Sequence, residues 1–334
     1  MNRNSLEEFR AQVKALKVPD EMAKKVEELM ERGIPIIEVT GQLESRKGYL
    51  EATMHLKCSA NEFYYLNKYD LALSSAKAAE KGKDYFILSQ DDKGKPQFKR
   101  FESPIAAIEN FKKRTGDAEL AIGIPDRENL DYRQTLATMK DGKVDYVVKE
   151  FQVPFKIDPI RNTVFVNRGT GLNMKQSANM LQGGSAYRDD LVSRQGANYK
   201  AWNNYLLNEP RDNYGNLKIK QYSEGYGFDL KTQLDNYSIK EMGKPETAEK
   251  LIAELKDGGR PLVNVVNGEG ESMILRMQAM PRFGNLNFYN QYGKPENREQ
   301  FQKLTKEEAM GKENNFSKKL NKSKDAVKDQ EMSM

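Results

Sequence analysis

Apolar positions recur at helical spacing in two distant stretches of the chain, and each stretch is followed by three shorter apolar runs. In residues 20–32, Met22, Val26 and Leu29 fall on one side of a predicted helix, and Gly33 ends it. The runs that follow are separated by polar turns and predict strands over 34–39, 49–56 and 63–73. Near the end of the chain a helix over 246–257 is followed by predicted strands over 262–266, 273–280 and 286–289.

Identical residues link these two stretches and predict an internal repeat. Six pairs share one offset: Pro19 and Pro245, Lys24 and Lys250, Glu28 and Glu254, Leu29 and Leu255, Gly33 and Gly259, Pro35 and Pro261. Farther along, Asn67 and Tyr69 match Asn290 and Tyr292, with three residues fewer in between. This alignment puts Gln278 at the position of His55.

The middle of the chain predicts a third, more divergent copy of this helix followed by three strands. Asn173 caps a short helix that ends at Leu181 before Gly183-Gly184, and strands follow over 187–192, 199–207 and 217–222. The region before it predicts a helix over 104–114 and strands over 85–88, 97–101, 119–124, 132–139, 144–153 and 163–166, with Asp141-Gly142 as a tight hairpin turn.

The fold class is therefore α+β, built from repeated helix plus antiparallel three-stranded units. The predicted divisions are a first unit over 1–75, a middle region over 76–170, a second unit over 171–242, a third over 243–302, and a disordered tail over 303–334.

The composition narrows the class of protein without naming a reaction. The chain has 334 residues, of which 31% are charged and 38% hydrophobic, and its formal net charge is +5. One cysteine, Cys58, excludes an internal disulfide framework. The first ten residues lack a secretory apolar core, and no apolar run has the length of a membrane span, so a cytoplasmic protein without a membrane partner is expected.

Catalytic motifs are sparse. His55 is the single histidine, so it is the one candidate for a histidine-dependent mechanism; the alternative is an exposed or hydrogen-bonded strand residue. Cys58 is three residues away, which on a strand places it on the opposite face. No enzymatic activity and no cofactor or metal site are expected.

Two segments are candidates for binding nucleic acid or another anion. The first is a basic segment with interleaved phenylalanines, comprising Lys93, Lys95, Lys99, Arg100, Lys112, Lys113 and Arg114. It predicts either a phosphate-tracking patch or a solvated charged face. The second is Arg168-Gly169-Thr170-Gly171, which follows a strand and precedes a helix, and which predicts either an anion site or a simple turn.

Several phrases together resemble a known family. They are ESPIAAIENFK from Glu102, NMKQSANMLQGGSAYRDDL from Asn173, YGNLKIKQY from Tyr214, YGFDL from Tyr226, SIKEM from Ser238, PRFGNLNFY from Pro281 and GKPENREQF ending at Phe301. They are similar to an uncharacterised domain-of-unknown-function family of Bacteroidetes, found on conjugative transposons and plasmids, sometimes beside or fused to topoisomerase- or primase-like modules. The resemblance implies an accessory role in mobile-element biology, and the family has no established catalytic residues to carry over to this chain.

The resulting hypothesis is a non-catalytic accessory protein of a mobile genetic element that contacts DNA or a DNA-processing protein. The alternative is a protein-interaction scaffold that captures a partner along exposed strand edges, without nucleic acid. An enzyme is the third reading. The sequence leaves the oligomeric state open.

Overall fold

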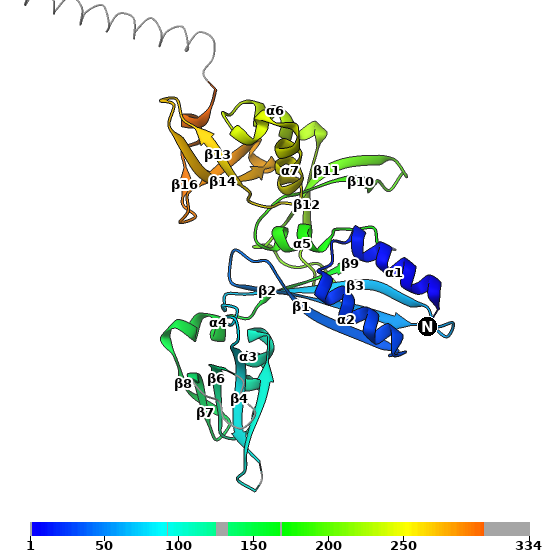
Figure 1. Cartoon of the computed structure of the whole chain (residues 1–334), viewed down its shortest axis with the longest axis vertical. Coiled ribbons are helices and arrows are strands. Elements are labelled where there is room, and N and C mark those ends of the chain that lie inside the picture. Colours follow the sequence, from blue (N-terminus) through cyan, green and yellow to red (C-terminus); the bar gives the residue numbers. More distant parts are fainter. Residues whose placement is uncertain (1, 92, 125–132, 168, 304–334) are drawn as a thin grey trace, which may run out of the picture. The chain divides into compact units, whose positions relative to one another are not determined.

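The structure, a computed structural model, describes residues 2–91, 93–124, 133–167 and 169–303 (Figure 1). The chain divides into two compact units. The first comprises Met1–Ala186 and Asn203–Gln221, and the second comprises Tyr187–Trp202 and the residues from Tyr222 onward. Within the described ranges there are seven α-helices and four sheets, which confirms the α+β class.

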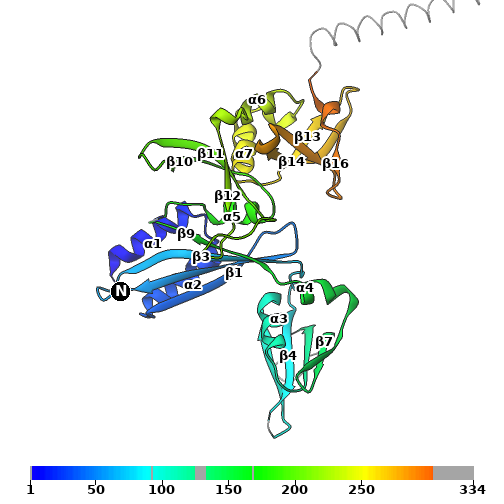
Figure 2. The same ribbon diagram turned by 180° about the vertical axis from the view of Figure 1, so that it is seen from behind.

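The first unit contains a four-stranded antiparallel sheet with helices on one face (Figures 1 and 2). In sheet order the strands are β1 (Ile36–Leu43), β2 (Tyr49–Cys58), β3 (Tyr64–Ser74) and β9 (Ile160–Phe165). The helices are α1 (Arg3–Ala15), α2 (Asp20–Glu31) and α5 (Met174–Leu181). Helix α2 contacts β1, whereas α1 and α5 contact β3.

Strand alternation explains why this sheet buries one face. Successive strand residues point to opposite sides, so Ile37 and Val39 of β1 are buried while Ile36 and Glu38 are exposed. The helices complete the core with buried residues such as Val26. Most side chains on the other face are polar and at least partly exposed, apart from the buried Glu51 and Ala72.

A second module is inserted between two neighbouring strands of this sheet. Strands β3 and β9 pair directly, yet a complete five-stranded sheet lies between them in the sequence. Its order is β5 (Pro96–Phe101), β4 (Asp84–Gln90), β6 (Ala118–Gly123), β7 (Gln134–Lys140) and β8 (Lys143–Val147). Helix α3 (Pro104–Lys112) packs on β4 and β6, and the module has its own apolar core. The predicted strand over 163–166 therefore belongs to the first sheet.

One predicted strand is partly wrong. The run over 144–153 forms β8 only as far as Val147, then a 3-10 turn over Lys149–Phe151 and helix α4 (Gln152–Lys156). Phe151 and Phe155 are both buried, four residues apart, which is a helical rather than a strand period.

The second unit contains the sheet β13 (Leu262–Val266), β14 (Ser272–Met280), β15 (Asn285–Tyr289) and β16 (Pro295–Glu296). Helices α6 (Leu230–Asp235) and α7 (Pro245–Lys256) contact it. The boundary between the units falls within a third small sheet, β10 (Ala186–Val192), β11 (Asn198–Tyr205) and β12 (Ile219–Ser223). None of the helices in the described ranges combines the length and the apolar character that a membrane span requires.

The predicted repeat agrees in element order, while its residue alignment fails at the end of the helix and again in the second half. Helix α2 ends with Gly33 donating to the Met30 carbonyl, and α7 ends with Gly258, not Gly259, donating to the Leu255 carbonyl. Asn67 and Tyr69 lie within β3, whereas Asn290 and Tyr292 lie in the turn after β15. A common origin of the segment with α2 and β1–β3 and the segment with α7 and β13–β15 stays a prediction.

The backbone pairing favours a counterpart for His55 other than Gln278. The Pro35 carbonyl accepts from Cys58 N–H, and the Pro261 carbonyl accepts from Met277 N–H. If these two prolines are equivalent, Cys58 corresponds to Met277, and the counterpart of His55 is Ile274.

The predicted hairpin at Asp141-Gly142 is confirmed and gives a stability prediction. Both residues have positive φ, 49° and 73°, as a type I′ turn requires. A Cβ on Gly142 would lie 2.6 Å from the Thr115 carbonyl oxygen, whereas one on Gly94 (φ 74°) would meet nothing within 4 Å. We expect Gly142→Ala to lower the melting temperature clearly more than Gly94→Ala, which carries only the backbone strain of about 1 kcal/mol. Equal melting temperatures for the two variants would contradict this.

Candidate functional site

The sheet face opposite the helices in the first unit forms an ordered grid of side chains. Each row crosses the strands at paired Cα positions. One row holds Ile36, Lys57 and Tyr65; the next holds Glu38, His55, Lys68 and Phe165; the third holds Thr40, Thr53, Asp70 and Thr163; the fourth holds Gln42, Glu51, Ala72 and Arg161. We call this surface the open face.

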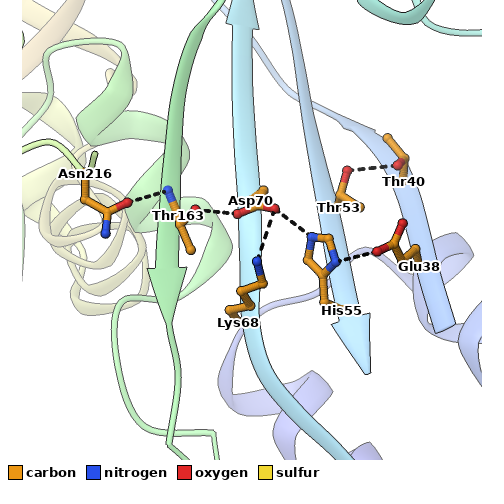
Figure 3. A network of polar contacts seen from close by, with 8 residues as sticks. All are labelled: Glu38, Thr40, Thr53, His55, Lys68, Asp70, Thr163 and Asn216. Atoms are coloured by element: carbon orange, nitrogen blue, oxygen red, sulfur yellow. Dashed lines mark hydrogen bonds and ion pairs between the residues drawn. The ribbon is translucent and has the colours of Figure 1, made fainter. Parts of the chain in front are cut away.

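A chain of polar contacts crosses the middle of the open face (Figure 3). His55 Nδ1 lies 3.1 Å from Glu38 Oε1, and His55 Nε2 lies 2.7 Å from Asp70 Oδ2. Thr163 Oγ1 donates to the other Asp70 oxygen at 2.6 Å. Lys68 Nζ is 3.9 Å from Asp70. These contacts connect all four strands and hold their registers on this face.

His55 contacts a carboxylate through each of its two ring nitrogens. Each nitrogen faces a carboxylate, and a neutral imidazole can donate to only one of them. Cys58 donates its thiol to the Ser59 carbonyl at 3.5 Å. The structure thus agrees with the hydrogen-bonded strand histidine expected from the sequence.

One end of the open face is apolar and exposed. Ile36, Tyr65 and Phe165 are 65%, 48% and 66% exposed. Lys57 pairs with both Ile36 and Tyr65, and Lys68 pairs with Phe165. We call Ile36, Lys57, Tyr65, Lys68 and Phe165 the aromatic end.

The side chains of the aromatic end share one face because antiparallel partners point the same way. The ring of Tyr65 is also supported from one side by Phe63, whose centroid lies 4.9 Å away. Two exposed aromatic rings beside two lysines can stack on flat ligands and attract anions. None of these five residues is a predicted site residue. The signal for Ile36, Tyr65 and Phe165 is an apolar residue at a strand position that alternation assigns to solvent.

A polar pocket of about 660 Å³ adjoins the network. Asp70 and Thr163 line it together with Arg161, Arg211 and Tyr214. Arg161 forms an ion pair with Glu109, and Arg211 donates to the Gly215 carbonyl. The lining carries both signs of charge, so it selects neither anions nor cations. Among the residues that the structure describes, no three His, Cys, Asp or Glu side chains are grouped to hold a metal ion.

Glu51, in the fourth row, gives a prediction of pH dependence. Burial raises the pKa of its carboxyl group, against the opposing hydrogen bond from Ser103 and the charge of Arg161. The folded state therefore binds this proton more tightly than the unfolded state, so stability falls as pH rises through the ordinary carboxyl pKa, about 4.3, toward the raised value. Above the raised pKa the whole destabilisation is present.

We expect Glu51→Gln to raise the melting temperature at neutral pH, and this gain should shrink as pH falls below about 4.3. Calorimetry across a pH series measures both effects. The exposed Glu44 provides the control, because Glu44→Gln should change neither. A gain that is the same at every pH would show that the carboxyl charge is not its source.

The predicted basic segment does not form one surface. Lys99 and Arg100 are neighbours on β5 and point to opposite faces of its sheet. Lys99 Nζ lies on the α3 side, 3.4 Å from Asn110 and over the Phe101 ring. Arg100 is paired with Asp84 at 2.7 Å on the other side. Arg100→Glu would place two carboxylates together, so this substitution is expected to lower stability.

The remaining basic residues are spread over a turn and a helix end. Lys93 and Lys95 flank Gly94 in the β4–β5 turn, where their backbone N–H groups donate to Asp91. Lys112 lies 3.6 Å from Asp158 and over the Phe155 ring. Lys113 and Arg114 follow α3, and Lys113 is exposed. Nucleic-acid binding by this segment stays a prediction.

The glycine turn before α5 is used for packing. Arg168 lies outside the described residues. Thr170 N–H donates to the Asn167 carbonyl, and Gly169 (φ 81°) lies close enough to α1 that a Cβ would be 3.4 Å from Gln12. Asn173 and Gln176 form a capping box at the α5 N-terminus. With Gly171 leading into this cap, the segment fits the simple-turn alternative better than an anion site.

No family model matches this chain, and neither a curated protein nor a solved structure matches it. The resemblance to the Bacteroidetes family therefore stays a prediction, and the function has to be argued from the site.

Proposed function

We propose that this chain is a non-catalytic, cytoplasmic accessory protein of a mobile genetic element and that its open face binds single-stranded nucleic acid. The observation that carries the proposal is the aromatic end, where exposed Tyr65 and Phe165 lie on adjacent strands beside Lys57 and Lys68. The mobile-element role rests on the sequence resemblance alone.

Stacking is the interaction that this geometry favours. A base that stacks on an exposed aromatic ring contributes about 1–3 kcal/mol to binding, and every base has a face that can stack. Sheets with helices on one face and aromatic side chains on the other bind single strands in this way. The Glu38–His55–Asp70–Thr163 contacts hold the strands in register, so the rings are positioned before the ligand arrives.

The charges of the open face favour a single strand over a duplex. Bases in a duplex are already stacked on one another, and a duplex presents mainly phosphates. Only Lys57 and Lys68 stand at the aromatic end, and Glu38 and Asp70 lie in the neighbouring rows. Two phosphate contacts give a log–log salt slope of only about 1.4.

Binding of labelled oligothymidylate, followed by fluorescence anisotropy, tests the proposal. We expect Tyr65→Ala and Phe165→Ala each to weaken binding by about 5- to 150-fold, which corresponds to one stacked base of about 1–3 kcal/mol. Tyr146→Ala is the matched control, since Tyr146 is 54% exposed on the inserted module and lies outside the basic segment. A wild-type chain that binds no oligonucleotide even at low salt, or a control variant that loses as much affinity, would overturn the proposal.

The scaffold alternative is favoured by one specific observation, the free outer edge of β1. The hydrogen bond from Cys58 N–H to the Pro35 carbonyl fixes the pattern of the β1–β2 ladder, so the backbone groups of residues 36, 38, 40 and 42 point away from β2. Within the described part of the chain nothing pairs with that edge. In contrast, Asn216 caps Thr163 N–H on β9, and Glu241 caps Asn264 N–H on β13.

Thr40→Pro separates the two functions. It removes an outward N–H without breaking the β1–β2 ladder, so it should block strand addition by a protein and leave oligonucleotide affinity unchanged. Val39→Pro, which breaks the ladder itself, is the control for simple misfolding. The scaffold would replace our proposal on two results together: the wild type binds a purified protein partner that Thr40→Pro does not bind, and the wild type binds no oligonucleotide.

A further inference from the structure

The second unit has an exposed sheet face of its own. Buried residues such as Val263, Leu275 and Phe288 point toward the core, so the alternate residues point outward. One outward row pairs Leu262, Arg276 and Tyr289, and Ile274 lies in the next row. Leu262 and Ile274 are exposed apolar side chains, and Arg276 is exposed beside them.

Two arginines are held in fixed positions on this face. The Arg260 guanidinium lies 4.3 Å from the centroid of the Tyr289 ring, and its Nε donates to Gln278 Oε1 at 2.7 Å. Stacking and this hydrogen bond restrict the side chain while leaving its two terminal nitrogens for a ligand. Arg276 Nη1 donates to the Arg260 carbonyl at 3.3 Å, which fixes the second guanidinium near the first.

These guanidiniums lack an acidic partner. In the described ranges no carboxylate forms an ion pair with Arg260 or Arg276. The acidic group on the neighbouring strand edge, Glu241, accepts from the N–H and the side-chain amide of Asn264. The face therefore presents two uncompensated positive charges with planar donor geometry, flanked by apolar side chains.

We infer that Arg260 and Arg276 form a second binding site, for the phosphodiester backbone of a single-stranded nucleic acid. An arginine fork matches the oxygens of a phosphate, and exposed Ile274 and Leu262 offer a flat apolar surface to an adjacent base. The inference rests on the proposed function for the class of ligand, but its site is separate from the aromatic end. Each unit then carries one site for the same kind of strand.

The test uses the full chain and labelled oligothymidylate over a salt series. Each arginine that contacts a phosphate adds about 0.7 to the log–log slope, so Arg260→Gln and Arg276→Gln should each lower the slope by about 0.7 and weaken binding about fivefold at 0.1 M salt. Arg282→Gln is the matched control, because Arg282 is an exposed arginine of the same unit at the turn after β14. Arg276→Gln alone remains decisive if Arg260→Gln fails to fold.

Combining these variants with Tyr65→Ala/Phe165→Ala separates the two sites. If only Tyr65→Ala/Phe165→Ala weakens oligonucleotide binding, and both arginine variants bind as tightly as Arg282→Gln, this inference is overturned and the proposed function stands. If only Arg260→Gln and Arg276→Gln weaken oligonucleotide binding, the inference is supported and the role of the aromatic end is overturned. Displacement of the oligonucleotide by polyglutamate at equal charge concentration would show a carboxylate site instead, which also overturns the inference.

Discussion

Replacing Tyr69 with alanine is expected to destabilise the first unit by about 3–5 kcal/mol, the usual range for removal of a large buried aromatic side chain. Tyr69 is fully buried in β3, and its hydroxyl donates to the Leu172 carbonyl at 2.7 Å and contacts the Ser177 hydroxyl at 2.7 Å. The ring fills the core below the open face, and the hydroxyl fixes the approach to α5.

Hydrogen exchange measured by mass spectrometry on the full chain locates this effect. Peptides from β1, β2, β3 and α5 should exchange faster in Tyr69→Ala, and peptides from β13–β15 should not. Tyr69→Phe keeps the ring and loses the two polar contacts, so we expect a smaller cost of about 1–3 kcal/mol. If Tyr69→Phe were as damaging as Tyr69→Ala, the packing of the ring would not be the main contribution.

Phe288→Ala is expected to cause a loss of similar size in the second unit. Phe288 is fully buried between Tyr237 and Phe301, with ring centroids 5.1 and 5.3 Å away. Besides about 3–5 kcal/mol for the lost side chain, each aromatic pair contributes about 0.5–1.5 kcal/mol. Phe301 ends the last 3-10 turn, so this turn should lose its attachment to the sheet.

In Phe288→Ala the exchange pattern should be the reverse of that in Tyr69→Ala. Exchange should become faster in β13–β15 and should stay unchanged in β1–β3. Phe283→Ala is the control, since Phe283 is exposed in the same unit and should change stability by no more than about 0.5 kcal/mol. Faster exchange throughout the chain would show that the two units unfold as one.

Local signals predicted most of the elements in this chain. Helix α2 combines acids in its first turn with Met22 and Val26 on one face and Gly33 after its end, and each signal acts within a few residues. The hairpin at Asp141-Gly142 is equally local. No helix is predicted over residues 3–15, although Leu6, Phe9 and Val13 recur there at helical spacing and pack into the core.

Long-range arrangement is what sequence patterns could not supply. That β9 pairs with β3 depends on a partner far away in the chain, and a strand's own residues do not name its neighbour. The alignment of Asn67 with Asn290 failed for a related reason, since identical residues can stand in a strand and in a turn.

The same limit applies to the candidate site: local signals are visible in the sequence, whereas the neighbours of each side chain are not. Clustered lysines and arginines with interleaved phenylalanines pointed to the basic segment, but the pairing of Arg100 with Asp84 and of Lys112 with Asp158 becomes visible only in three dimensions. Tyr65 and Phe165 are about a hundred residues apart and meet on one face because β3 and β9 are neighbours. No local window contains both.

The insertion between β3 and β9 sets an order of events during synthesis. A ribosome adds about 5–20 residues per second, so several seconds pass between the completion of β3 and that of β9. Throughout this interval the outer edge of β3 displays unpaired backbone groups, which other nascent chains can pair with. The inserted module, with a core of its own, can fold meanwhile and shorten the loop that remains to be closed. A chain that stops before residue 160 never covers that edge, so its truncated products are the ones that should aggregate.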